Sequence, residues 1–128
     1  MILGIGTDIV EIERIKKACE KEAFLSSVFT EKERAYAGPD TKKACWAASL
    51  AGDFAVKEAV VKALGTGFVG CAPRDVEVIR AESGAPEVVL YRGAKKHFQE
   101  RRAKRLWVSM SHEKAFATAM AVLEGDEI

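Results

Sequence analysis

The chain has few cysteines, no long apolar run and almost no net charge, and each shortage argues against a class of protein. Its three cysteines are odd in number and form no Cys-x-x-Cys pair, which argues against a zinc site and predicts reduced thiols. No apolar run approaches about 18 residues, so we expect no membrane span. A formal net charge of +1 gives no general attraction to nucleic acid.

The first residues are also a poor secretion signal. No basic segment precedes their apolar stretch, and Asp8 interrupts that stretch. Together with the unpaired cysteines, this predicts a cytoplasmic protein. The 128 residues, 48% of them apolar, predict one domain over residues 1–128 with a core that needs no disulfides.

Alternation and helical periodicity predict the order of the elements. A strand is expected over residues 1–10, an amphipathic helix over 11–26, and another helix after Thr30, which stands three residues before Glu33 in a capping-box pattern. The alanine-rich stretch 41–64 predicts the longest helix. The other expected elements are a hairpin of strands 76–80 and 86–90, a basic helix over 92–104, and strands over 106–110 and 116–123. This order predicts an α+β fold in which the long helix packs on a largely antiparallel sheet.

An aspartate stands inside the first predicted strand. Asp8 shares a strand face with Gly4 and Gly6, so the alternation leaves open space beside its carboxylate, where another group could approach closely. A carboxylate buried in an apolar strand needs a partner or a metal. The alternative is an aspartate at the strand end that forms a local turn or caps a helix near residue 10.

The long helix carries a carboxylate and a lysine one turn apart. Glu58 and Lys62 stand at i and i+4 and project from the same face, as Asp53 and Lys57 do on a neighbouring stripe. Such pairs are usually surface ion pairs worth about 0.2–0.5 kcal/mol. If the fold brings Asp8 to Glu58, however, two carboxylates and an ammonium surround one point, which suits Mg²⁺ and a phosphorylated substrate.

Two further motifs leave alternatives open. Ser111-His112 ends a predicted strand, where the imidazole is either a surface group or one that donates a hydrogen bond to phosphate or moves a proton. Gly65 and Gly67 are not followed by the Gly-Lys-Ser/Thr of a phosphate loop, so they are either a helix stop or a place where backbone approaches a ligand.

Basic residues are concentrated between positions 92 and 105, with only Glu100 against them. The default interpretation is a solvated helix face, and the alternative is an anionic partner. Single-stranded nucleic acid would call for interleaved aromatic side chains, and only Phe98 and Trp107 are near. The basic residues are Arg92, Lys95, Lys96, Arg101, Arg102, Lys104 and Arg105.

Four segments in order resemble a known family. They are residues 5–12, with Gly-Thr-Asp at 6–8; residues 29–33; residues 54–67, which begin Phe-Ala-Val-Lys-Glu-Ala; and residues 108–112. This combination is similar to the holo-acyl-carrier-protein synthases, the small bacterial type of 4′-phosphopantetheinyl transferase. The resemblance implies that family's fold. It also implies transfer of phosphopantetheine from coenzyme A to a serine of apo-acyl carrier protein in fatty acid biosynthesis, with release of adenosine 3′,5′-bisphosphate.

The resemblance also assigns roles to matching positions. Asp8 and Glu58 are the implied Mg²⁺ ligands, and Lys62 is implied to neutralise phosphate charge as the leaving group departs. Glu58, or a water on the metal, is implied to take the proton of the carrier serine. The positions implied to border coenzyme A are Lys62, Gly65, Gly67, Ser111 and His112.

Assembly and carrier docking follow from the resemblance in the same way. The family forms trimers with active sites at subunit contacts, so a homotrimer is expected. The acidic carrier is expected to dock on Arg14, Lys17 and Lys21, although Glu13 and Glu20 dilute that basic patch. No nucleic-acid or membrane partner is expected.

One position departs from the family. The family usually has arginine where this chain has Asp53, and that arginine helps hold the nucleotide end of coenzyme A. We therefore expect weaker or differently oriented nucleotide binding, unless Asp53 simply pairs with Lys57. Two other functions stay open: a module of this fold that binds coenzyme A or a carrier without transfer, and a nucleic-acid binder that uses residues 92–105.

Overall fold

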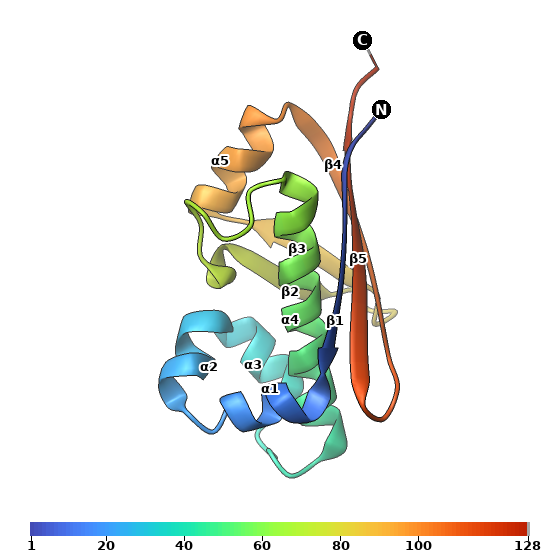
Figure 1. Ribbon diagram of the computed structural model, residues 1–128. Coiled ribbons are helices and arrows are strands. Elements are labelled where there is room, and N and C mark those ends of the chain that lie inside the picture. Colours follow the sequence, from blue (N-terminus) through green and yellow to red (C-terminus); the bar gives the residue numbers. More distant parts are fainter. Residues whose placement is uncertain (128) are drawn as a thin grey trace.

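Helix α4 (Ala44–Leu64) lies at the centre of the fold, which a computed structural model describes for residues 1–127. The predicted long helix is confirmed, because its alanines favour helix and Gly65 ends it in the left-handed conformation with φ of 80°. Figure 1 shows strand β1 (Ile2–Glu11) alongside α4. None of the helices within residues 1–127 is both long and apolar enough to cross a membrane.

Three short helices cover the start of α4: α1 (Ile12–Ala18), α2 (Glu22–Val28) and α3 (Glu31–Ala37). The single helix predicted over 11–26 is wrong, because the chain turns between α1 and α2. In a straight helix Ile15 and Leu25 would point about 80° apart, whereas the turn lets both enter one core.

The predicted capping box of α3 is confirmed. The Glu33 backbone N–H donates to Thr30 Oγ1 at 3.3 Å, and the Thr30 N–H donates to Glu33 Oε1 at 2.8 Å. Two otherwise unpaired donors at the helix start are satisfied in this way.

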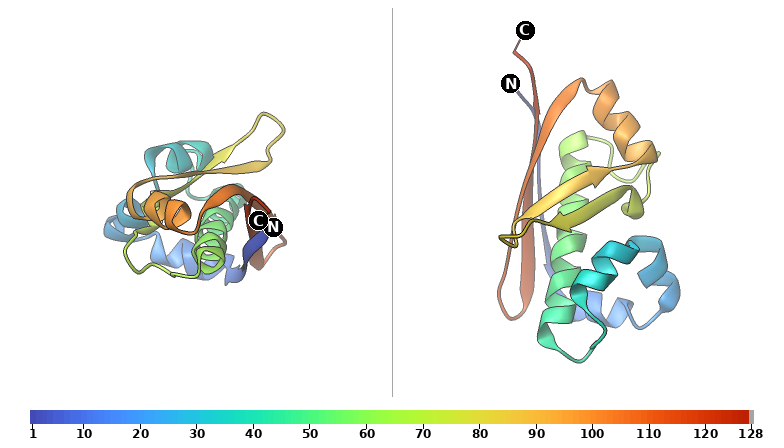
Figure 2. Two further views of the ribbon diagram at one scale, coloured as in Figure 1. Left: turned by 90° about the horizontal axis from the view of Figure 1, so that it is seen from above. Right: turned by 180° about the vertical axis from the view of Figure 1, so that it is seen from behind.

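The strands pair antiparallel, as expected, but they form two sheets rather than one. Strands β1, β5 (Phe116–Gly125) and β4 (Ala103–His112) form one sheet in that order, and β2 (Val76–Arg80) pairs with β3 (Pro86–Leu90) after the short 3₁₀ turn η1 (Pro73–Asp75). Figure 2 shows this hairpin crossing α4. Because β1 pairs with β5, the two chain ends lie together (Figure 1).

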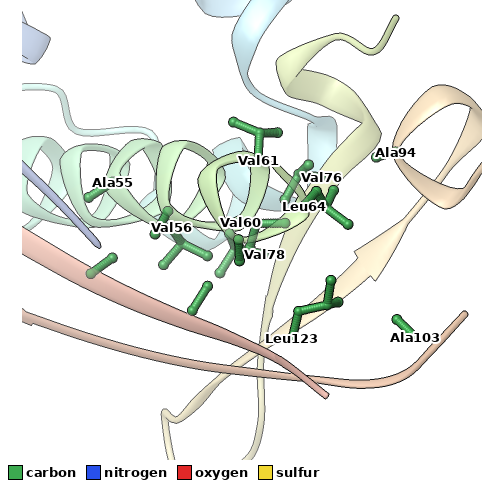
Figure 3. Close-up of a cluster of buried hydrophobic side chains, with 14 residues drawn as sticks. Ala55, Val56, Val60, Val61, Leu64, Val76, Val78, Ala94, Ala103 and Leu123 are labelled. Carbon is green, nitrogen blue, oxygen red and sulfur yellow. The ribbon is translucent and has the colours of Figure 1, made fainter. Parts of the chain in front are cut away.

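The main core lies between α4, the three-stranded sheet and β2. Figure 3 shows Val60 and Leu64 of α4 near Val76 and Val78 of β2 and Leu123 of β5, and all five are at most 3% exposed. The other core cluster lies beneath α1 to α3 and includes Ile15, Leu25, Phe29 and Trp46. The alanines of α4 keep its axis close to its neighbours.

The glycines of β1 do not leave the open space that the alternation predicted. A Cβ on Gly6 would clash with the Ala59 carbonyl oxygen, and one on Gly4 would clash with that of Ala63. The group that approaches this strand face is therefore α4 itself. This contact fixes where Asp8, two residues further along, stands against the helix.

The spacing of Asp53 and Lys57 predicted a surface pair, but the structure does not have this pair. The Lys57 side chain is fully buried and pairs with the equally buried Glu33 at 2.9 Å. Its ammonium also donates to the carbonyl oxygens of Pro73 at 3.0 Å and Val76 at 2.6 Å. The neighbouring stripe of α4 therefore faces the interior.

The basic run begins with helix α5 (Arg92–Glu100), which is shorter than predicted, and continues to the start of β4. Two of its arginines make internal contacts. Arg92 Nε lies 2.7 Å from Asp75 Oδ1, and Arg101 donates to the carbonyl oxygens of Leu3 and Leu64, both at 2.6 Å. Both arginines therefore contribute to the fold, although the Arg92 side chain is still 68% exposed.

Candidate functional site

Asp8, Glu58 and Lys62 meet where β1 passes α4. Lys62 Nζ lies 3.2 Å from Asp8 Oδ1 and donates to the Thr7 carbonyl oxygen at 2.9 Å. Glu58 lies one turn earlier on α4, and it lines the same cavity of about 620 Å³ as Asp8. The fold thus brings together the two carboxylates and the ammonium that the sequence singled out.

The charges of this group influence one another. Burial raises the pKa of Glu58, the nearby Asp8 carboxylate raises that pKa further, and Lys62 opposes both effects. A carboxyl group with a raised pKa is suited to exchange protons nearer neutral pH.

The donors present fit a hard divalent cation that keeps several ligands of its own. Asp8 Oδ2 is buried and has no hydrogen-bond partner in the protein. Within residues 1–127, no three His, Cys, Asp or Glu side chains gather as a complete metal site. Mg²⁺ is usually bound by one or two carboxylates, and water and phosphate oxygens fill its other coordination positions.

Asp8 stands between two cavities. The cavity that Glu58 shares is walled by apolar side chains, among them Phe24 and Phe54, and Arg14 of α1 stands at its edge. The second cavity, about 590 Å³, has Lys62 and Ser111 in its lining. The sequence did not predict that these phenylalanines line a cavity, because their spacing is that of ordinary core residues.

The other predicted binding residues do not gather at one place within the chain. Gly65 and Gly67 have φ of 80° and 58° and form the turn that ends α4. His112 instead lines a third cavity with Cys45, near the start of the same helix. A helix of 21 residues is about 30 Å long, so His112 and the Gly65–Gly67 turn lie at opposite ends of α4.

The remaining predicted docking residues lie on the surface. Lys17 of α1 and Lys21, which follows it, are exposed like Arg14. Arg14 alone of the three lines the cavity that holds both carboxylates. Basic side chains thus lead from the edge of this cavity along α1.

Asp53 presents no charge to solvent. It is 1% exposed, and its Oδ1 lies 2.9 Å from Arg80 Nη2 of β2. Burial raises the pKa of Asp53 to about 7, against the opposing effect of Arg80. The sequence predicted either repulsion of a nucleotide or a pair with Lys57, and the structure shows a buried pair with Arg80 instead. Sequence reasoning missed Arg80 because the two residues come from separate elements.

Comparison with known proteins identifies the family. The model of the 4′-phosphopantetheinyl transferase superfamily matches residues 4–121. A holo-[acyl-carrier-protein] synthase of Lachnoclostridium phytofermentans is 44% identical over 124 residues, which are 97% of each chain.

Solved structures agree with this match. One is a holo-(acyl-carrier-protein) synthase of Bacillus anthracis in complex with coenzyme A (3′,5′-ADP). It has a TM-score of 0.81 at 35% identity, with 98% of this chain and 99% of that chain covered. An acyl carrier protein synthase of Plasmodium yoelii with ADP bound has a TM-score of 0.87 at 32% identity, with 99% and 98% covered. The chain therefore belongs to the holo-[acyl-carrier-protein] synthases of the 4′-phosphopantetheinyl transferase superfamily.

Proposed function

We propose that this protein transfers the 4′-phosphopantetheine group of coenzyme A to a serine of apo-acyl carrier protein, with release of adenosine 3′,5′-bisphosphate. The observation that carries this proposal is the meeting of Asp8, Glu58 and Lys62 where β1 passes α4, between two cavities that share Asp8, in a chain of the holo-[acyl-carrier-protein] synthase family. Residues 1–128 act as one transferase domain in the cytoplasm, where coenzyme A and the carrier are available.

The reaction is a phosphoryl transfer. The serine Oγ forms a bond to the phosphorus nearest the pantetheine arm, and the bond from that phosphorus to the bridging oxygen of the pyrophosphate breaks. Adenosine 3′,5′-bisphosphate leaves with the bridging oxygen. Catalysis of such a step depends mainly on positioning and charge neutralisation, which the charged groups of this site supply.

Each charged side chain has a defined part in this proposal. Asp8 and Glu58 would hold Mg²⁺, which supplies neutralisation of the pyrophosphate charge when it is bound. Lys62 stabilises the negative charge that develops on the leaving group. Glu58, or a water beside it, accepts the proton of the carrier serine.

We further infer that the active form is a homotrimer. The sheet face turned away from α4 exposes several large apolar side chains, and a patch of this kind commonly marks a contact surface. Within one chain, His112 and the Gly65–Gly67 turn lie at opposite ends of α4. In a trimer, a second copy would bring its own Ser111 and His112 to this turn. The exposed apolar residues are Ile5, Ile9, Trp107, Phe116 and Met120.

The acidic carrier docks on α1 in this proposal. Arg14 stands at the edge of the cavity that Glu58 lines, so a carrier held by Arg14 would present its serine to the carboxylates. Lys17 and Lys21 extend the basic surface away from the cavity. Opposite charges on the two proteins would speed their encounter at low salt.

Mass spectrometry of the carrier tests the transfer directly. Apo-acyl carrier protein incubated with the enzyme, coenzyme A and Mg²⁺ should gain one phosphopantetheine group. Asp8→Asn and Glu58→Gln should each lower turnover by at least about 100-fold, as loss of a group acting in the transition state does. Glu87→Gln, at an exposed position on β3, is the matched control. Coenzyme A binding without any transfer, across several carriers and metals, would refute the proposal in favour of a binding module.

A further inference from the structure

The residue before Glu58 is a lysine that points into the protein. Consecutive helix residues lie about 100° apart, so Lys57 faces the interior while Glu58 faces the cavity. The Lys57 side chain is 0% exposed, and burial lowers its pKa while Glu33 raises it. A buried ammonium is costly unless its protons are hydrogen-bonded, which raises the question of what this lysine does.

All three protons of the ammonium have acceptors in other parts of the fold. They go to Glu33 Oε2 at 2.9 Å, to the Pro73 carbonyl oxygen at 3.0 Å and to the Val76 carbonyl oxygen at 2.6 Å. Glu33 is itself fixed, because Oε1 accepts from the Thr30 N–H and Oε2 accepts from the Val78 N–H at 2.7 Å. One side chain of α4 is thereby joined to α3, η1 and β2.

The two carbonyl acceptors lie at the far end of the segment that contains the glycine turn. The chain leaves α4 through Gly65–Gly67, passes beside α5 and returns to α4 at Pro73–Val76, as Figure 1 shows. The beginning of this segment is held to α4 by backbone hydrogen bonds: the Gly65 N–H donates to the Lys62 carbonyl oxygen at 3.0 Å, and the Thr66 and Gly67 N–H groups donate to that of Val61, both at 3.2 Å. Its return to α4 is held by the Lys57 ammonium.

We propose that Lys57 is a positioning residue for coenzyme A. It fixes the return of the 65–76 segment to α4 and so, together with the backbone hydrogen bonds that end α4, holds the Gly65–Gly67 turn in place beside Lys62. This inference rests on the proposed function, in which that turn borders coenzyme A. A displacement of about 1 Å at a binding group can cost about 100-fold in rate, so a small shift of the segment is enough to matter.

Stability alone does not explain the charged pair. Buried ion pairs can often be replaced by apolar residues of similar volume at no loss of stability. A methionine at position 57 would fill similar space, but it cannot donate to Pro73 or Val76. The donated hydrogen bonds, rather than the packing, are therefore what the lysine contributes to the segment.

Two matched variants separate the hydrogen bonds from the ion pair. Glu33→Gln removes the anion but leaves the Lys57 amine able to donate to both carbonyls. The double variant Lys57→Met with Glu33→Gln removes those donors and leaves no buried charge. In both proteins the Glu33→Gln amide keeps one oxygen for the Thr30 N–H but places an NH2 group where Oε2 accepted from Lys57 and from the Val78 N–H. Because both variants share this change, their difference reports the Lys57 hydrogen bonds.

Calorimetry should show coenzyme A bound about tenfold or more weakly by the double variant than by Glu33→Gln. The KM for coenzyme A should rise in the double variant while the KM for the carrier stays unchanged. A purely structural defect would lower the active fraction and leave both KM values alone. Amide hydrogen exchange in residues 65–76 should be faster in the double variant than in Glu33→Gln.

Equal coenzyme A affinity in Glu33→Gln and the double variant would overturn the inference, as would equal exchange in residues 65–76. Either result leaves the proposed transfer reaction standing, because that reaction is judged by the wild-type product. Hydrogen exchange needs no coenzyme A or carrier, so it tests the segment even in a protein that transfers nothing.

Discussion

Gly6 of β1 packs directly against the backbone carbonyl of Ala59 in α4, which leaves no room for a side chain at position 6. This contact sets the separation between the strand that carries Asp8 and the helix that carries Glu58. The geometry of the candidate site therefore depends on a residue that has no functional group of its own.

Gly6→Ala should destabilise the protein by about 1–3 kcal/mol, because the added Cβ must push β1 away from the backbone of α4. Urea unfolding followed by circular dichroism measures the loss. Glu87→Ala, at an exposed position on β3, should change stability by less than about 0.5 kcal/mol. Equal stability of the two variants would show that β1 can move freely.

The pKa of Glu58 should respond in opposite directions to its two charged neighbours. Asp8→Asn removes a negative charge that raises this pKa, so the pKa should fall. Lys62→Met removes a positive charge that lowers it, so the pKa should rise. Carbon-13 NMR titration of the Glu58 carboxyl group measures both changes.

Glu13→Gln serves as the control for that titration, because Glu13 lies on an exposed face of α1. It should leave the Glu58 titration unchanged. A Glu58 pKa that ignores both the Asp8 and the Lys62 substitutions would mean that the three groups do not meet in solution.

Asp53 should make the protein less stable as pH rises toward neutrality. Burial raises its pKa from an ordinary 3.8 to about 7, so the folded state favours the protonated form. Its contribution to stability is full below about pH 4 and is lost as pH rises through 7, a difference of the order of 4 kcal/mol. The free energy of unfolding is measured for the wild type and for Asp53→Asn from pH 4 to pH 8. The change with pH in the difference between the two proteins gives the contribution of Asp53.

Other carboxyl groups titrate over the same range, so only the difference between the two proteins isolates Asp53. A difference between Asp53→Asn and the wild type that stays constant from pH 4 to pH 8 would contradict the raised pKa.

Ile5→Glu should dissociate the assembly without unfolding the chain. Ile5 is 58% exposed on the apolar sheet face, and a carboxylate there would have to be buried in any contact between copies. Sedimentation should show a smaller particle with unchanged circular dichroism, and transfer activity should fall. Val89→Glu, at a 41% exposed site on β3, should keep the assembly intact. A wild type that sediments as a monomer would contradict the trimer.

Local signals in the sequence were enough to predict most of the helices and strands. The capping box at Thr30 and Glu33, and the alanine-rich stretch before Gly65, each depend on residues a few positions apart, and the structure has both. The turn between α1 and α2 was missed because it follows from how Ile15 and Leu25 share a core. No local pattern carries that information.

Long-range partners could not be predicted from spacing. Lys57 pairs with Glu33 and Asp53 pairs with Arg80, and in each case the partner comes from another element. The meeting of Asp8 with Lys62 was expected only through the family resemblance, since a strand and a helix can pack in many ways. Interior ion pairs depend on the complete fold.

The pairing of β1 with β5 has a consequence for how the protein is made. Within the described residues, β1 joins the sheet only through β5, which is the last strand of the chain. During synthesis the segment that carries Asp8 emerges before the other elements described here, yet its hydrogen-bonding partner β5 emerges after them. A nascent chain that has not yet reached β5 contains Asp8, Glu58 and Lys62 but lacks the sheet that holds β1. Contacts this distant in sequence slow folding, so the candidate site should become ordered late, when β5 has left the ribosome.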